Sequence, residues 1–511
     1  MDVNTRYKPV PGPERMPGAI AKRVPSARGW ILPVLCLTSS PALAADWEVT
    51  PRISGSVEIT DNVTLAPRGE ESSDLIGRIN PGVNLRRISP RMETRVSYRL
   101  NSRYHASESQ EDRVSHHLRA RSDWEVIPDT FFIEARASRR ENVSSLLAPV
   151  GIDGSTPRGN LEETTRYSLS PVLRTRFGSF AEQELRYTYD EIRYHGSDRP
   201  NSDAHRVEYT LDSGAAFNRP FWQVAASHEK ERFESGPEGE FSEVSGTLGY
   251  RFGRSLRLFG VAGYEDNDFP TTREDVDGGF WEVGANWAPT RVTRIDGRYG
   301  ERYFGKTRAF SLDHRSRRAS YRLSFNEGIT STRERRGAQF NELSQQLGMT
   351  VDELFDQFTL EEVSFLLAIS GLTEEAVVAN YFFTRTWRAS WSYDTGRSVF
   401  GVNAFQTQRE SELESGLGLF QDNRRRTGIN ASWQWNLGPR TTSELSTGFS
   451  NTEFLGVDRE DDRWYLRASV SREITPVLTA RLALRHQRRD SDSRANEYRE
   501  NSIIGMLIKE F

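Results

Sequence analysis

Hydrophobic and polar residues alternate along most of this chain with a period of two, which is the pattern of an extended strand with one apolar face and one polar face. In residues 46–60 the apolar side chains fall on one side of such a strand and only polar side chains fall on the other. The same alternation recurs in residues 113–126, 281–287, 428–435, 464–471 and 478–485. These segments predict half-buried β-strands.

Short turn sequences and long polar loops follow one another between the predicted strands. The short turns are predicted at 89–90, 128–129, 218–220, 252–255, 288–290, 395–397, 437–440 and 475–477. The longer loops are predicted at 61–73, 141–160, 190–202, 265–279, 410–421, 453–462 and 489–496. Short turns at one end and long loops at the other are typical of a bacterial outer-membrane barrel, whereas a soluble sandwich rarely has so many strands.

The series predicts an all-β fold, a transmembrane antiparallel β-barrel of about 22 strands with a range of 18–24. An even number of strands places both ends of the barrel on the periplasmic side. The last residues, 496–511, read as the closing strand, and the terminal Phe511 is predicted to take part in barrel closure. Tryptophans near strand ends fit interfacial girdles better than a sandwich core. They are Trp47, Trp124, Trp222, Trp287, Trp387, Trp391, Trp435 and Trp464.

Residues 333–380 interrupt the pattern with helical signals in what strand order makes an outward loop. Residues 341–348 read as a short helix ended by glycine, and Thr350 and Thr359 each begin a capping-box sequence. Because wide barrels are commonly plugged, this insert is predicted to be a plug or a lid. The alternative is a surface subdomain that leaves the channel open.

The N-terminal residues 1–45 have the order of a secretory signal peptide. Basic residues precede an apolar run at 30–37, and small residues at 42–45 offer a cleavage site. Residues 46–511 then form the predicted barrel domain. Translation from Met16 instead of Met1 is an open alternative for this long leader.

Composition agrees with a barrel and excludes two other classes. The mean hydropathy of −0.66 and the absence of an apolar run of about 20 residues beyond the leader exclude a helical membrane protein. The net charge of −4, with acidic and basic residues interspersed, gives no nucleic-acid footprint. We expect the partners to be outer-membrane lipid and the barrel-assembly machinery.

Candidate chemistry is confined to a charged pore lining. The histidines have no metal-ligand spacing, and the chain lacks the motifs of nucleotide-binding sites and serine hydrolases, so we predict neither an enzyme nor a cofactor. An enzymatic site assembled on the barrel wall remains a third alternative. The polar faces of the strands are predicted to line the lumen and to tune selectivity for polar or anionic solutes. The candidate lining residues are Glu282, Arg294, Asp296, Arg298, Arg467, Arg481 and Arg485.

The start of the mature chain resembles a known family. Residues 47–51 and 59–66, together with the chain-long barrel pattern, the helical interruption and Phe511, are similar to outer-membrane proteins associated with PEP-CTERM/exosortase systems in Gram-negative bacteria. Lys509 departs from the usual apolar position two residues before the final aromatic. The resemblance implies residence in the outer membrane and a function as a channel or accessory protein for the secretion or surface assembly of exopolysaccharide. Exopolysaccharide and its export proteins would then be partners. The alternative is a non-conducting scaffold that anchors surface polymer or sorted proteins.

Overall fold

The structure is a computed structural model, and it describes most of the chain from Trp47 to Phe511. The residues left undescribed are 1–46, 146, 153, 198, 236–237, 332–340, 345–350, 352–353, 355–362, 364–365, 368–380, 413–422 and 457. The predicted signal peptide therefore lies outside the described residues. The unit that contains the barrel spans Asp46–Phe511.

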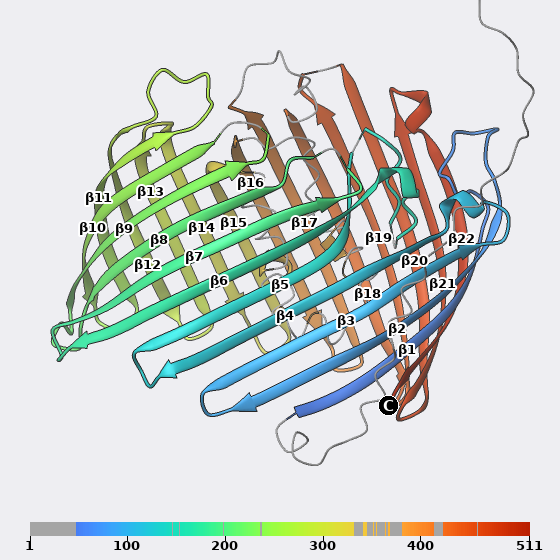
Figure 1. The fold of residues 1–511 in the computed structure, drawn as a ribbon, viewed down its shortest axis with the longest axis horizontal. Coiled ribbons are helices and arrows are strands. Elements are labelled where there is room, and N and C mark those ends of the chain that lie inside the picture. The colour runs from blue at the N-terminus through green and yellow to red at the C-terminus, as the bar shows by residue number, and fades with distance from the viewer. Residues whose placement is uncertain are drawn as a thin grey trace, which may run out of the picture. The chain divides into compact units, whose positions relative to one another are not determined.

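Within the described residues, 22 strands form one closed antiparallel sheet in which each strand pairs with its neighbours in sequence (Figure 1). The first half consists of β1 (Trp47–Thr60), β2 (Asp74–Ser89), β3 (Met92–His105), β4 (Arg113–Ile127), β5 (Phe131–Val143), β6 (Leu161–Phe177), β7 (Ala181–His195), β8 (Ser202–Ser213), β9 (Pro220–Phe233), β10 (Gly239–Phe252) and β11 (Leu256–Asp268). The second half consists of β12 (Gly278–Thr290), β13 (Thr293–Arg302), β14 (Gly305–Arg315), β15 (Ala319–Ser331), β16 (Tyr381–Asp394), β17 (Ser398–Ser411), β18 (Arg424–Gly438), β19 (Thr441–Phe454), β20 (Arg459–Thr475), β21 (Leu478–Ser491) and β22 (Tyr498–Glu510). The predicted fold class and the predicted strand number are confirmed.

The last strand closes the barrel by pairing with the first. The register of β22 on β1 runs from Arg52 opposite Glu510 to Thr60 opposite Ser502. The strand ends one residue before the terminus, but the backbone N–H of Phe511 still donates to the carbonyl oxygen of Pro51 at 3.0 Å. Closure leaves no unpaired edge between first and last strands, which is what a sheet surrounded by lipid requires.

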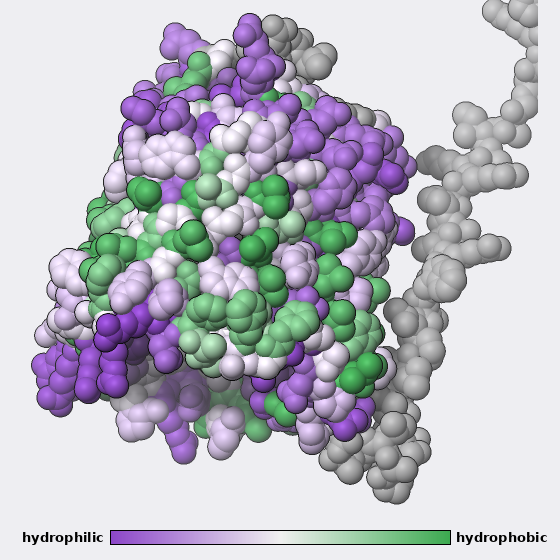
Figure 2. Space-filling view, turned by 90° about the vertical axis from the view of Figure 1, so that its left-hand side faces the viewer, coloured by the Kyte–Doolittle hydropathy of each residue, from purple (hydrophilic) through white to green (hydrophobic). Residues whose placement is uncertain are grey.

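The outward faces of the strands carry an apolar band. Figure 2 shows hydrophobic side chains gathered across the middle of the barrel wall, with hydrophilic side chains above and below them. On β1 this face presents Val49, Ile53, Val57 and Ile59, which are 49%, 40%, 53% and 58% exposed. Such a continuous exposed apolar surface is unfavourable in water and stable in a bilayer. The fold is therefore that of an outer-membrane barrel.

Some boundaries differ from the sequence-based prediction. The turns at 178–180 and 316–318 and the connections at 106–112, 234–238 and 303–304 were not foreseen. The predicted turn at 288–290 lies inside β12, whose register shifts between Trp287 and Thr290. Several outward loops are shorter than predicted because charged strand ends continue the ladder: β20, for example, already begins at Arg459. Below, the end of the barrel with the short turns is called the periplasmic end, and the end with the long loops is called the outer end.

The helical insert is described only in part. The described residues 341–344, 351, 354, 363, 366 and 367 are all helical. Leu343, Leu354, Val363 and Leu367 form a buried apolar cluster, and Leu366 packs against it. The predicted capping residues Thr350 and Thr359 lie outside the described residues.

Candidate functional site in the lumen

The strand register decides which side chains face the lumen. Residues directly opposite in an antiparallel pair share a face, so the polar face of β1 can be followed around the sheet. All of the predicted lining residues lie on this lumenal face: Glu282 on β12, Arg294, Asp296 and Arg298 on β13, Arg467 on β20, and Arg481 and Arg485 on β21. They do not form one site, because the register places the first four and the last three on different sectors of the wall.

Arg485 belongs to a buried network across the closure of the barrel. Its guanidinium Nη2 lies 2.6 Å from Oε1 of Glu58 and 2.7 Å from Oε1 of Glu500. Glu58 also forms ion pairs with Arg78 and, at 3.8 Å, with Arg103. The side chains of Glu58, Glu500 and Arg485 are at most 1% exposed. One carboxylate from the first strand therefore links β1 to β2, β3 and β21.

The long loop 144–160 folds inward over this network instead of extending outward. Its backbone and Ser155 are held by lumenal side chains of three strands, β4, β21 and β22. The hydrogen bonds run from Gln487 Nε2 to Ser155 Oγ (2.8 Å), from the Ile152 N–H to Gln487 Oε1 (3.0 Å), from Arg489 Nη1 to the Ala148 oxygen (2.8 Å), from the Tyr498 hydroxyl to the Val150 oxygen (2.6 Å) and from Arg113 Nη1 to the Thr156 oxygen (3.2 Å). The loop narrows the lumen next to the closure.

Arginines lie directly opposite one another on neighbouring strands of the same sector. The lumenal row nearest the periplasmic end runs across four strands, and a second row lies closer to the outer end. The rows are Arg86–Arg95–Arg121–Arg136 and Arg78–Arg103–Arg113, and the opposed pairs Arg409–Arg424, Arg463–Arg489 and Arg467–Arg485 continue the pattern on β17–β21. Like charges placed directly opposite destabilise a sheet unless anions compensate them.

Each arginine of the periplasmic row has an acidic partner, which is Glu48 for Arg86 and Glu134 for Arg136. Arg95 and Arg121 each lie 2.6 Å from an acid on the same strand, Glu93 and Asp123 respectively. These acids are themselves opposite each other, one step nearer the periplasmic turns. On β3 and β4 these ion pairs run along the strands, whereas Glu48 pairs with Arg86 across two neighbouring strands.

A different sector of the wall, on β9–β13, is acidic. Here the lumenal residues Glu243, Glu265 and Glu282 surround a single guanidinium, that of Arg302. A cavity of about 360 Å³ opens beside them near the outer end of the barrel. The predicted lining residues Glu282 and Arg298 both border it. Sequence reasoning missed Glu265 and Arg302 because only the register shows that they meet.

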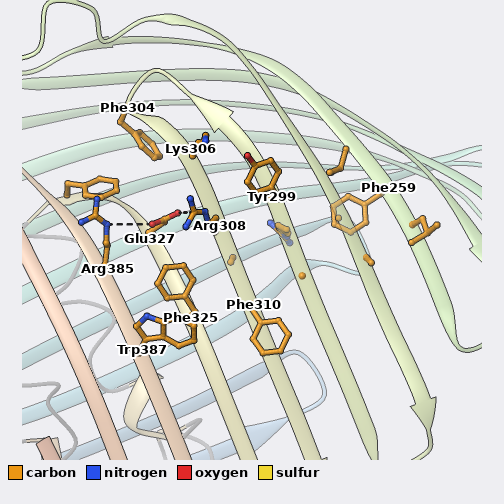
Figure 3. A pocket seen from close by; sticks show the side chains of 18 of the residues that line it. Phe259, Tyr299, Phe304, Lys306, Arg308, Phe310, Phe325, Glu327, Arg385 and Trp387 are labelled. Atoms are coloured by element: carbon orange, nitrogen blue, oxygen red, sulfur yellow. Dashed lines mark ion pairs between the residues drawn. The ribbon is translucent and has the colours of Figure 1, made fainter. Parts of the chain in front are cut away.

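A larger groove, of about 1320 Å³, lies on the outer surface of the wall over β11–β17. Tyr299 and Trp387 line it, on the face that carries the apolar band. Figure 3 shows Glu327 between Arg308 and Arg385, and the ion pairs measure 3.9 Å and 3.7 Å. Ala285 and Gly297, which lie opposite each other on the outer face, leave room for the groove because neither has a large side chain.

Two arginines of the lumenal wall contact the helical insert. Arg119 on β4 donates through Nη1 to the backbone oxygen of Val351 at 3.0 Å. Arg388 on β16 forms an ion pair with Glu342 at 2.8 Å. Because both arginines lie on lumenal faces, the helical residues that they contact lie on the lumenal side of the barrel wall.

The described part of the chain shows neither a metal site nor a membrane-spanning helix. Among those residues, no group of three or more histidine, cysteine or acidic side chains is arranged to hold a metal ion. None of the helices described there is long and apolar enough to cross a bilayer.

The closed 22-strand wall defines an outer-membrane β-barrel, and solved structures share this fold. The FrpB iron transporter from Neisseria meningitidis is 9% identical, and the match covers 91% of this chain and 82% of that chain at a TM-score of 0.54. The siderophore receptor PirA from Acinetobacter baumannii is 8% identical, with coverages of 90% and 80% and a TM-score of 0.50. No family model and no curated protein matches the chain. At these identities the likeness concerns the fold alone.

Proposed function

We propose that this protein is a gated outer-membrane channel that passes an acidic exopolysaccharide. The observation that carries the proposal is the set of directly opposed arginines on the lumenal wall, above all the row from Arg86 to Arg136. The side chains of Arg95, Arg121 and Arg136 are 34%, 45% and 57% exposed, so a passing anion can reach them. Carboxylate or phosphate groups on a polymer are the ligands that a guanidinium binds in bidentate fashion.

Ion selectivity in planar bilayers tests this proposal. The wild-type channel should be anion-selective in a salt gradient, and the double variant Arg95→Gln/Arg121→Gln should move the reversal potential towards cation selectivity, because Glu93 and Asp123 then lose their partners. The control variant, Arg139→Gln/Arg193→Gln, also removes two positive charges, but from the outer surface. There Arg139 pairs with Glu163 and Arg193 pairs with Glu191. A cation-selective wild type, or equal shifts for both variants, contradicts the proposed function.

The gate is the helical insert, which the contacts with Arg119 and Arg388 support as a plug. A variant that lacks residues 335–377 should conduct more than the intact protein. Unchanged conductance would refute gating by the insert.

A second function, that of a non-conducting scaffold for surface polymer or sorted proteins, is supported by the same contacts, because an insert held in the lumen would block conduction. The same recordings distinguish the two functions. A wild type and a deletion variant that both fail to conduct support the scaffold, whereas current in the deletion variant supports the channel.

A further inference from the structure

The acidic cavity on β9–β16 has features that an anion channel does not use. It lies at the outer end of the barrel, because its lining residues Glu231, Arg302, Ser331 and Tyr381 are all within three residues of the outer ends of their strands. Its volume of about 360 Å³ is within the range of small-ligand pockets.

Three carboxylates in this cavity share one guanidinium. Arg302 Nη1 lies 3.1 Å from Oε2 of Glu243 and also pairs with Oε1 of Glu265, while its Nε lies 2.9 Å from Oε1 of Glu282. Glu265 lies directly opposite Glu243 on the neighbouring strand, so two like charges face each other. One cation does not balance three anions, and the cluster keeps an excess of negative charge.

A second and independent feature of the cavity is the buried carboxylate of Glu265. Its side chain is 7% exposed and it lines the cavity. Its other carboxylate oxygen, Oε2, is buried and has no hydrogen-bond partner among the residues that the structure describes. A buried acceptor without a donor is unfavourable, so a ligand that donates a hydrogen bond to Oε2 would gain binding free energy there.

Aromatic rings complete the lining. Phe241 and Tyr381 lie with ring centroids 5.3 Å apart, and Tyr303 and Phe304 lie 5.2 Å apart. All four line the cavity. The face of an aromatic ring attracts a cation and offers an apolar surface for a sugar ring, while carboxylates accept hydrogen bonds from ammonium and hydroxyl groups.

We propose that this cavity binds an amine-bearing sugar unit, such as a hexosamine whose amino group is free and therefore positively charged. The ammonium group donates to Glu265 Oε2 and offsets the excess charge of the glutamates, and the ring packs against the aromatic side chains. The biological meaning of this site rests on the proposed function, in which a glycan passes the lumen, but the binding itself does not require conduction.

Binding is tested on the full chain folded in detergent micelles, by calorimetry with a glucosamine tetramer and its fully N-acetylated counterpart. The two probes have the same rings and differ in charge. We expect the amine form to bind at least tenfold more tightly, a difference of about 1.4 kcal/mol, and to lose affinity as salt is added. Equal binding of the two forms, or no binding of the amine form, overturns the proposal.

Variants assign the binding to the cavity. Glu265→Gln keeps the shape of the side chain and should weaken binding of the amine form roughly tenfold, while Glu444→Gln removes a carboxylate from β19, outside the cavity, and should leave binding unchanged. Equal losses in both variants would mean non-specific attraction and would refute the site. Gel migration before and after heating verifies that each variant is folded. If the wild-type protein is not anion-selective in bilayers, the proposed channel function is wrong, but the calorimetric binding of the glucosamine tetramer is unaffected. The two proposals therefore fail separately.

Discussion

The buried network at the barrel closure makes a sharp prediction for stability, with Glu58 as the residue to change. The Glu58→Gln substitution keeps the size of the side chain but removes the charge that faces Arg78, Arg103 and Arg485. Each of these arginines has a side chain that is at most 8% exposed. Removing one partner from a buried charge pair typically costs about 3–5 kcal/mol, because the remaining charge stays desolvated.

A matched control exists on the same face of the same strand. Glu48 pairs with Arg86 at 3.7 Å, and the two side chains are 67% and 51% exposed. An ion pair in that setting contributes at most about 1 kcal/mol, so Glu48→Gln should be close to neutral. The contrast between the two variants separates the effect of burial from the effect of losing a carboxylate.

The assay is urea unfolding of the protein refolded into phospholipid vesicles, followed by gel migration. Glu58→Gln should lower the free energy of unfolding by about 3–5 kcal/mol, and the double variant Glu58→Gln/Arg78→Met should recover part of the loss because one of the buried charges is gone. If Glu58→Gln and Glu48→Gln have equal small effects, the network does not stabilise the closure and the reasoning is wrong.

Three further predictions concern the loop, the insert and the outer rim. Gly151→Ala should raise conductance, because the new Cβ would clash with Ser155 Oγ and displace loop 144–160. Gly159→Ala should leave conductance unchanged, because its Cβ would meet nothing within 4 Å. Arg119→Gln/Arg388→Gln should make the insert more sensitive to added protease, and the outer-surface variant Arg385→Gln should leave its cleavage rate unchanged. Burial, together with the charges of Glu265 and Glu412, raises the pKa of Tyr303. The neutral phenol therefore stabilises the fold fully below the ordinary tyrosine pKa of about 10, and this contribution is lost as the pH rises. Unfolding at alkaline pH should then be less pH-dependent in Tyr303→Phe, and identical pH profiles would contradict this.

The local pattern was enough to predict the strands, because membrane strands repeat a two-residue alternation whose polar side must face the lumen. The local alternation assigns residues such as Ile59 to the outer side and Thr60 to the lumenal side, even when the neighbouring strands are unknown. Strand ends were harder to predict. The outer ends of β6 and β20 are charged, and charged residues read as loop until the ladder that continues through them is seen.

The candidate sites could not be predicted, because they depend on register and on closure. Glu58 and Arg485 are separated by 427 positions and meet only when β22 pairs with β1. A shift of one residue in any strand would turn its side chains to the other face. Likewise, loop 144–160 has an ordinary polar composition, and only Gln487 and Arg489 on a distant strand show that it folds inward.

On the closing strand, the lumenal side chains make more buried contacts across the closure than the terminal aromatic does. On its outward face β22 carries Gly505 and Lys509 beside Ile503 and Leu507, so this face has less apolar surface than that of β1. Phe511 itself is 64% exposed. On the lumenal face, by contrast, the hydroxyl of Thr60 donates to Glu500 at 2.8 Å, and Glu500 is held by Arg485 of the preceding strand. The contacts most shielded from competition by water are on this side, and they join strands from opposite ends of the chain. We therefore expect the charged network to reinforce the backbone ladder between β1 and β22, while Phe511 adds one backbone hydrogen bond at the rim.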